Sequence, residues 1–251
     1  MIWNRRQFLY TLGLSSLLPS TAFGFGESAL IDVMELNLGQ GTLSRPSAWS
    51  RLLYEIVHTT SIECQPKSIL RDLNAPDLFD HPFAVLIGDG AFELPKPTQL
   101  SRLSRYLAYG GFLYIDDVSG KRDGPFDKSV RRLLHTLFPT RPLTSVPSDH
   151  SVYRSFFLIK KPMGRIDLFD HMESITVGNL SPVIYMRNDL SGALERDASG
   201  QGRSVVGKLG GMAQRREAIK LGINLMMYSI SSNYKKDQAH VAELLRTGRM
   251  Q

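Results

Sequence analysis

Short continuous apolar runs alternate along this chain with stretches whose apolar residues have helical spacing. The clearest apolar runs are Phe83 to Ile87, Phe112 to Ile115 and Pro182 to Met186, each bounded by turn residues. Short runs of this kind are typical of strands that are buried on both faces of a sheet. They therefore predict interior strands of a parallel sheet.

The stretches with helical spacing begin at prolines. One helix is predicted to start at Pro46, because the apolar residues from Trp49 to Val57 recur at i, i+3, i+4, i+7 and i+8. A second is predicted to start at Pro97 and to end at Gly110, and a third to start at Pro125. Proline is favoured in the first turn of a helix and glycine just after the last, so these residues mark the expected bounds.

Strand and helix alternate through the first half of the chain, which predicts an α/β fold with a mostly parallel sheet and helices on both faces. No linker rich in Pro, Gly or Ser divides the chain, so we expect a single domain over residues 25–231 and a polar C-terminal helix or tail over 232–251. The remaining predicted elements are a first strand (Ala29–Leu36), a weak strand (Ser61–Cys64), an irregular strand (Val152–Ile159), a polar loop (Asp167–His171), a short strand (Ile175–Val177), a long loop (Ser191–Gly211), an apolar helix (Ala218–Ile230) and a polar final helix (Lys235–Arg249).

The N-terminus reads as an export signal over residues 1–24. Arg5, Arg6, Phe8 and Leu9 resemble the twin-arginine pattern, and an apolar segment ending at Pro19 follows. That segment is too short to span a bilayer, so no transmembrane span is expected once the signal is removed. A general secretory signal with two arginines is the alternative, and either route leads to the periplasm.

Composition narrows the classes of function. The chain has 251 residues, 42% of them hydrophobic and 22% charged, which is ordinary for a globular protein. A formal net charge of +6 without a basic stretch that includes aromatic residues predicts no nucleic-acid partner. Cys64 is the only cysteine, so an intramolecular disulfide and a thiolate-rich zinc site are excluded. We interpret it as a small buried residue rather than a nucleophile.

Several motifs occur in an order that resembles a known bacterial family, the domain-of-unknown-function family numbered 4159. They are Trp49, Gly88-Asp89-Gly90, the run from Gly110 to Asp117, His150 with Tyr153 and Arg154, Asn188-Asp189-Leu190, and the run from Arg216 to Tyr228. The resemblance covers about Leu30 to Ser231. It implies a flavodoxin-like sheet similar to that of class I glutamine amidotransferases, and it implies no activity.

One departure from the amidotransferases concerns their nucleophile. Their catalytic cysteine stands between a strand and a helix with glycines on either side, whereas the matching strand end here reads Gly88-Asp89-Gly90. Cys64 lies elsewhere, without small neighbours. We therefore do not expect amidotransferase chemistry.

The candidate chemistry lies in carboxylates that follow the predicted strands. Asp89, Asp116, Asp117 and Asp189 come at or just after strand ends, so parallel strands would deliver them to one edge of the sheet. Grouped carboxylates either hold a divalent cation such as Mg²⁺ or Ca²⁺, with Asp116 and Asp117 as the first candidate ligands, or supply an acid and a base. The structural alternative is that these aspartates cap helices and turns.

Other polar residues extend the candidate site. Asp89, Asn188, Tyr153 and Arg154 are the predicted binding residues, and His150 is a candidate acid or base for which a structural role is the alternative. Gly202 to Lys208 has the letters of a phosphate loop, but Leu209 replaces its Ser or Thr and no strand precedes it, so no nucleotide is predicted. The chain also lacks zinc-protease and G-x-S-x-G motifs.

The sequence thus favours an exported, non-catalytic module that binds a ligand or a periplasmic or membrane-associated protein. A metal-assisted hydrolase that uses the same aspartates is the alternative. No cofactor is predicted beyond the divalent cation that this second hypothesis requires.

Overall fold

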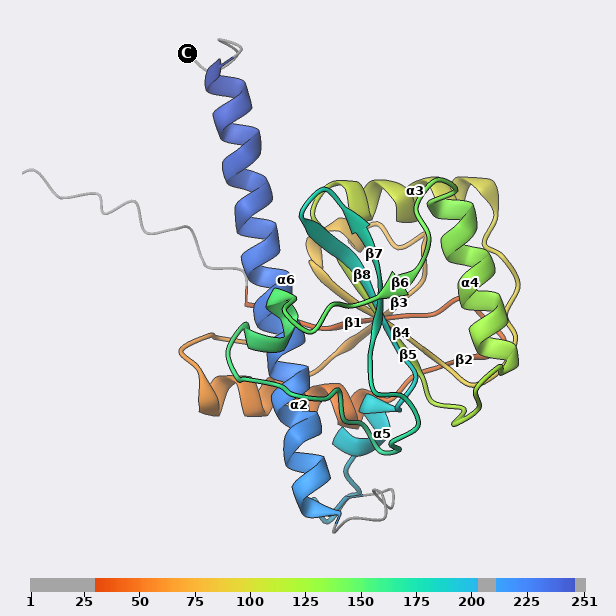
Figure 1. The fold of residues 1–251 in the computed structure, drawn as a ribbon, viewed down its shortest axis with the longest axis vertical. Helices are drawn as coiled ribbons and strands as arrows, with labels where there is room; N and C mark the ends of the chain where they lie inside the picture. Colours follow the sequence, from red (N-terminus) through yellow and green to blue (C-terminus); the bar gives the residue numbers. More distant parts are fainter. Residues whose placement is uncertain (1–29, 203–210, 247–251) are drawn as a thin grey trace, which may run out of the picture. The chain divides into compact units, whose positions relative to one another are not determined.

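The computed structural model describes residues 30–202 and 211–246, with 233–246 described as backbone only. The described residues from Ile31 onward form one compact unit, built on an eight-stranded sheet (Figure 1). The order along the sheet is β3-β1-β4-β5-β8-β7-β6, and β2 pairs with β4. The strands are β1 (Met34–Leu36), β2 (Thr42–Leu43), β3 (Ile69–Arg71), β4 (Phe83–Gly88), β5 (Phe112–Asp117), β6 (Thr144–Ser145), β7 (Glu173–Val177) and β8 (Leu180–Met186).

The predicted α/β class is confirmed, and so is the parallel arrangement of its interior strands. β3, β1, β4, β5 and β8 run parallel, whereas β7 and β6 add an antiparallel margin beside β8. A mostly parallel sheet with helices around it is compatible with a flavodoxin-like fold. β2 is a departure from the expected pattern, because it turns back after β1 and pairs antiparallel with the last two residues of β4, Ile87 and Gly88.

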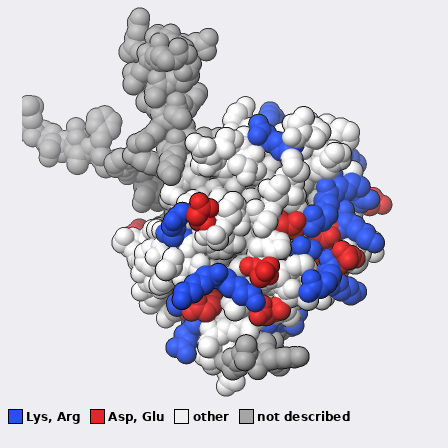
Figure 2. All heavy atoms as spheres, viewed as in Figure 1, with Lys and Arg blue, Asp and Glu red and all other residues white. Residues whose placement is uncertain are grey.

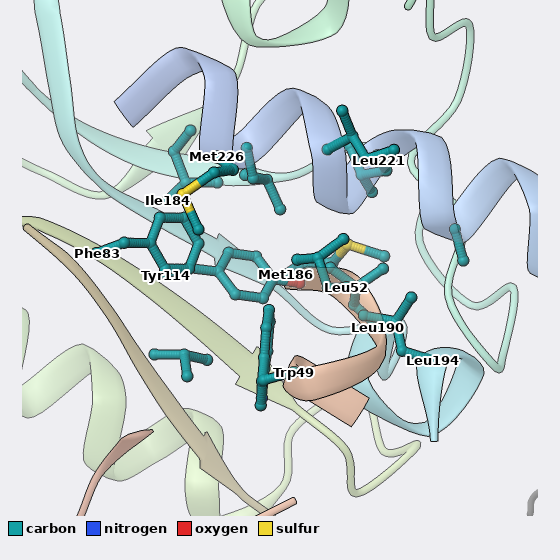
Figure 3. Close-up of a cluster of buried hydrophobic side chains, with 14 of the residues drawn as sticks. Trp49, Leu52, Phe83, Tyr114, Ile184, Met186, Leu190, Leu194, Leu221 and Met226 are labelled. Atoms are coloured by element: carbon teal, nitrogen blue, oxygen red, sulfur yellow. The ribbon is translucent and has the colours of Figure 1, made fainter. Parts of the chain in front are cut away.

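Helices cover both faces of the sheet. α2 (Pro46–Thr59), α5 (Leu190–Leu194) and α6 (Met212–Arg246) supply apolar side chains to one core, whereas α3 (Pro97–Ala108) and α4 (Pro125–Leu137) supply them to the other. In the first core Trp49 lies among side chains of β4, β5 and β8, with its ring centroid 6.0 Å from that of Tyr114 (Figure 3). Alternate residues of the buried strands thus face different helices.

The helix starts at Pro46, Pro97 and Pro125 are confirmed. Gly110 has a φ of 111°, the left-handed conformation that was expected to end α3. These predictions held because proline and glycine constrain the backbone locally, whatever the tertiary contacts are.

Several other element predictions were wrong. Val152–Ile159 is no strand, and a 3₁₀ helix, η3, covers Ser151–Arg154. Ser61–Cys64 contributes only an isolated bridge between Ile31 and Cys64, and the neighbouring strand is β3 instead. The first strand is limited to Met34–Leu36.

Two predictions on the C-terminal part were also wrong. The helix α5 interrupts the loop expected to run from Ser191, and the two helices expected after Ala218 are one helix, α6. No proline or glycine lies between the apolar and polar halves of α6, so nothing in the backbone ends the helix there. No helix in the described ranges combines the length and apolarity needed to cross a bilayer.

Candidate functional site at the carboxyl edge of the sheet

The carboxyl ends of β4, β5 and β8 lie side by side, as the sequence predicted. Asp116 on β5 is in register with Ile87 on β4 and with Met186 on β8, and Asp117 is in register with Gly88. The parallel course of these strands thus brings Asp116, Asp117 and Asp189 to one edge of the sheet.

Their side chains nevertheless do not form one pocket. Successive residues of a strand point to opposite faces, so Asp116 lies on the face covered by α2, α5 and α6, and Asp117 on the face covered by α3 and α4. Phe112 and Tyr114 belong to the first core and Leu113 and Ile115 to the second, which confirms this alternation. The carboxylates of Asp116 and Asp117 therefore belong to separate networks.

Asp116 is fully buried and holds the start of α5. Its Oδ1 accepts a hydrogen bond from the backbone N–H of Leu190 (2.9 Å), and its Oδ2 accepts one from that of Ser191 (2.8 Å). Burial, followed by the nearby negative charge of Asp189, raises the pKa of Asp116 to about 6. The carboxylate thus takes two helix N–H groups that would otherwise lack partners.

Asp189 is the N-cap of the same helix and is also fully buried. Its Oδ1 accepts hydrogen bonds from the N–H of Gly192 (2.8 Å) and from the guanidinium of Arg45 (2.8 Å), and its Oδ2 pairs with Arg165. Among the described residues it is the only one other than glycine with a positive φ, 55°. Asp tolerates this left-handed conformation better than most residues, and the cap and two ion pairs stabilise it.

Gly192 is required beside this carboxylate. A Cβ at that position would lie 2.4 Å from Oδ2 of Asp189, which is closer than real Cβ contacts come. Glycine therefore lets the first turn of α5 close on its own N-cap. The same geometry leaves no room for a ligand between Asp189 and the helix.

Asp117 takes part in a network on the other face. Its Oδ1 accepts a hydrogen bond from the N–H of Ser119 (2.8 Å), which forms a local turn, and its Oδ2 lies 3.3 Å from the hydroxyl of Tyr185. The Tyr185 hydroxyl also lies 3.0 Å from Oδ1 of Asp127. Burial is the main cause that raises the pKa of Asp117.

Arginines complete that network. Arg131 pairs with Asp127 (3.1 Å) and with Glu173 (2.9 Å), and Arg187 pairs with the same Glu173 (3.1 Å). On the face of the molecule drawn in Figure 2, basic and acidic side chains are likewise intermixed. Asp127 and Glu173 thus have cationic partners within the protein, and Asp117 is joined to them through the hydroxyl of Tyr185.

The structure separates the remaining predicted binding residues. Asp89 is exposed, whereas Asn188 is fully buried. Asn188 accepts hydrogen bonds from the N–H groups of Leu168 and Phe169 and donates to the carbonyls of Pro162 and Phe169. Because its amide is fully used in holding this loop, Asn188 does not share a site with Asp89.

His150 has a structural environment. Its Nδ1 accepts a hydrogen bond from the N–H of Val152 (3.2 Å), so the proton of the neutral ring is on Nε2, which lies 3.2 Å from Oγ of Ser181. Burial is the main cause that lowers the pKa of His150. A nucleophilic serine needs a histidine whose Nε2 accepts its proton. In the pair His150 and Ser181, Nε2 carries the proton and donates it to the serine oxygen, so it cannot accept the proton of the serine.

Tyr153 and Arg154 lie beside His150 on η3. The Tyr153 side chain is buried, and its hydroxyl accepts a hydrogen bond from the N–H of Met172 (3.4 Å). Arg154 is exposed and donates to the carbonyl of Asp149. Only Arg154 of these two is accessible to a partner.

The end of β4 is closely packed around its glycines, but the residue between Gly88 and Gly90 is the exposed Asp89 and not a cysteine. A Cβ at Gly88 would lie 2.1 Å from the ring of Phe126, and one at Gly41 would lie 2.2 Å from the carbonyl oxygen of Ala91. Cys64 is half-buried, and burial raises the pKa of its thiol to about 11, so it is a poor nucleophile at neutral pH.

No group of three or more His, Cys, Asp or Glu side chains within residues 30–202 and 211–232 is placed to hold a metal ion. Arg5, Arg6, Phe8 and Leu9 of the export pattern, and most of the stretch from Gly202 to Lys208, lie outside the described residues.

Sequence reasoning missed Glu35, Arg45 and Arg165. Glu35 is buried and accepts hydrogen bonds from the hydroxyls of Ser44 (2.8 Å) and Ser68 (2.6 Å) and from the N–H of Arg45 (2.6 Å). Its position inside an apolar run was a usable signal, because a charge buried in a strand requires partners. Nothing in the sequence pattern pointed to the two arginines.

The fold and this edge define a class of protein: a mixed α/β protein with a mostly parallel sheet, in which Asp116, Asp117 and Asp189 are bound internally. Residues 33–230 match the family described as Domain of unknown function (DUF4159), and the chain therefore belongs to that family. No curated protein matches the chain.

Proposed function

We propose that this protein is an exported, non-catalytic module that acts in the periplasm by binding a ligand or a periplasmic or membrane-associated protein. The observation that carries the proposal is the state of Asp116, whose two carboxylate oxygens each accept a backbone N–H of α5. A general acid or base must reach the reacting group of a substrate. A carboxylate that is buried and bound in this way serves the fold instead.

The alternative, a metal-assisted hydrolase, requires carboxylates that converge on a cation. Asp116 and Asp117 point to opposite faces, and Asp189 is neutralised by Arg45 and Arg165. This division of the aspartates favours a binding role over a metal-dependent reaction.

Calorimetric titration of the purified protein with Mg²⁺, Ca²⁺, Mn²⁺ and Zn²⁺ separates the two functions. We expect no saturable heat from the wild type, and none from Asp117→Asn. A saturable heat that disappears in Asp117→Asn would support the hydrolase and contradict the proposal.

A binding role is tested by cross-linking in the periplasm and purification of the cross-linked complexes. Asp89 and Arg154 are the predicted binding residues that are exposed. Asp89→Arg and Arg154→Glu are therefore expected to reduce recovery of a specific partner, whereas Lys128→Glu, an exposed residue on α4, is the control that should not. Equal recovery from all variants would exclude Asp89 and Arg154 as contacts of the partner.

Export rests on the pattern of Arg5, Arg6, Phe8 and Leu9. Replacement of both arginines by lysine keeps the charge and removes the feature that the twin-arginine route reads. We expect the double variant to remain in the cytoplasm, as measured by cell fractionation. Export of the double variant at the wild-type level would favour the general secretory route.

A further inference from the structure

The opposite edge of the sheet contains an opening between two interior strands. The pairing of β5 and β8 begins only at Leu113 and Val183, one residue after Pro182, which has no N–H to donate to the ladder. The N–H of Ser181 donates to the hydroxyl of Tyr228 instead (2.8 Å). The amino ends of β5 and β8 are therefore not joined.

A cavity of about 310 Å³ lies at this opening. Its lining is mostly apolar and includes Leu107, Phe112, Phe138 and Leu180, while Gly110 and Gly111 contribute backbone only. Gly111 has to be glycine, because a Cβ there would lie 2.4 Å from the ring of Tyr106. A largely apolar cavity of about 300 Å³ is at the lower end of the size range of small-molecule sites.

Two further hollows adjoin this cavity. One, of about 300 Å³, shares Gly110 and Gly111 with it and is also lined by Phe79, Tyr109 and Arg105. The other, of about 380 Å³, shares Ser104 with the cavity and is also lined by Arg105. We call the three together the amino-edge hollow. Phe79 and Tyr109 contribute aromatic side chains to the second of these hollows.

Among the described residues, Arg105 is the only charged one that lines the amino-edge hollow, and it lines the two adjoining hollows rather than the cavity itself. Within the described residues it makes no ion pair, and its guanidinium carbon lies 6.0 Å from the ring centroid of Phe79. The neighbouring Arg102 differs, because it donates to the carbonyls of Leu73 and Ala75. The hollow thus combines an apolar cavity with one positive charge that no carboxylate of the described residues neutralises.

We infer that the amino-edge hollow binds a small amphipathic anion, a molecule with an apolar chain or ring and a single carboxylate. The apolar part occupies the cavity behind Gly110 and Gly111, and the carboxylate faces the guanidinium of Arg105. An uncharged apolar ligand would leave Arg105 without a role, and a cationic one would be repelled by it. This inference rests on the proposed binding function and gives it a ligand class.

The test uses octanoate as the probe, titrated into the full chain by calorimetry, with octanol and octylammonium as matched neutral and cationic probes. We expect octanoate to bind at one site and octylammonium not to bind. Arg105→Gln is expected to weaken octanoate binding about fivefold, the loss of one partly exposed ion pair. It should leave octanol binding unchanged, and Lys128→Gln is the control for the change in charge.

Ala108→Trp tests the location, because Ala108 is exposed at the end of α3 and lines the cavity. We expect this variant to lose octanoate binding, whereas Thr59→Trp, at the exposed end of α2, should keep it. Ser104→Trp is a second variant at the same mouth in case Ala108→Trp unfolds, which circular dichroism would show.

Four outcomes would overturn the inference. Two of them are octanoate binding that survives in both tryptophan variants and equal affinities for octanoate and octanol. A third is a concentration-dependent dimer that Ala108→Trp abolishes, which would make the hollow an interface between copies. An absence of octanoate binding in the wild type also overturns it, but leaves the proposed function standing. A saturable metal heat would contradict the proposed function and leave the octanoate result valid.

Discussion

The two edges of the sheet differ in a way that reverses the usual expectation for open α/β proteins. Ligands generally bind at the carboxyl ends of parallel strands. Here that edge carries the conspicuous polar residues, but Asp116 and Asp189 are buried and bound to α5 and to arginines. The amino edge carries few polar side chains and contains the cavity of about 310 Å³.

The difference teaches that a polar residue at a strand end can be there to supply a hydrogen-bond partner to buried backbone groups. Its presence alone is therefore not evidence of a ligand site. α5 is short, and its first N–H groups lie against the sheet, where water cannot reach them. Asp116 and Asp189 supply the missing acceptors. At the amino edge Pro182 has no N–H to pair with β5, and Gly110 and Gly111 have no side chains. These two features leave the space that forms the cavity.

The largest expected effect is that of Asp189→Ala. The substitution removes the N-cap of α5 and leaves the partly buried guanidinium groups of Arg45 and Arg165 without a counter-ion. We expect a loss of about 3 to 5 kcal/mol in the free energy of unfolding, measured by urea denaturation. A loss below about 1 kcal/mol would mean that the carboxyl edge is less tightly built than its contacts indicate.

Asp116→Asn tests the same edge through its pH dependence. The pKa of Asp116 is about 6 in the folded protein and about 3.9 in an unfolded chain. The folded state therefore binds the proton more tightly, and the stability of the wild type falls as pH rises from about 4 to about 6. The expected fall from this group is on the order of 3 kcal/mol.

Asp116→Asn does not titrate, so the stability difference between wild type and variant should change over that interval. Chemical denaturation at a series of pH values measures it, and the wild type should lose stability relative to the variant as pH rises. A constant difference would show that the carboxyl group of Asp116 has an ordinary pKa.

Gly88→Ala is expected to have an intermediate effect. The added methyl would meet the ring of Phe126 at 2.1 Å, and Phe126 is buried. We expect a cost of about 1 to 3 kcal/mol, typical of overpacking in a core, from thermal or urea unfolding. Gly90→Ala is the control, because its methyl would lie 3.1 Å from the Cα of Gly41, a contact that a small shift relieves. Equal stabilities would show that the end of β4 has room for a side chain.

Asp89→Asn is expected to have the smallest effect. Asp89 is exposed at the carboxyl edge, and no ion pair with it is found in the described parts of the chain. We expect a change within about 0.5 kcal/mol in the free energy of unfolding. A larger loss would mean that Asp89 belongs to the buried carboxylate network after all.

The interior of the fold could be predicted from the sequence, because its signals are local. Phe83 to Ile87 and Phe112 to Ile115 are too apolar to be anything but buried, and Pro46, Pro97 and Pro125 fix where helices start. The short strands β2 and β6 could not be predicted, because two residues carry no periodicity and their pairing depends on distant partners.

The candidate site was predicted only in part, for a related reason. The sequence placed Asp116 and Asp117 at a strand end, and the alternation of a strand already implied that they face opposite ways. Arg45 and Arg165, which neutralise Asp189, come from segments 144 and 24 residues away. The tertiary fold brings such partners together, and no pattern in the sequence predicts them.

The return of the chain at β2 has a consequence for how the family can vary. Residues 37–41 form a surface turn of the kind that ordinarily tolerates insertions and deletions. Here the residues after the turn are held in place. Thr42 and Leu43 pair with β4, and Arg45 contacts both Glu35 and Asp189. An insertion between Leu43 and Pro46 would displace Arg45 from both carboxylates. We therefore expect homologues to keep the length of this connection constant even where its residues change.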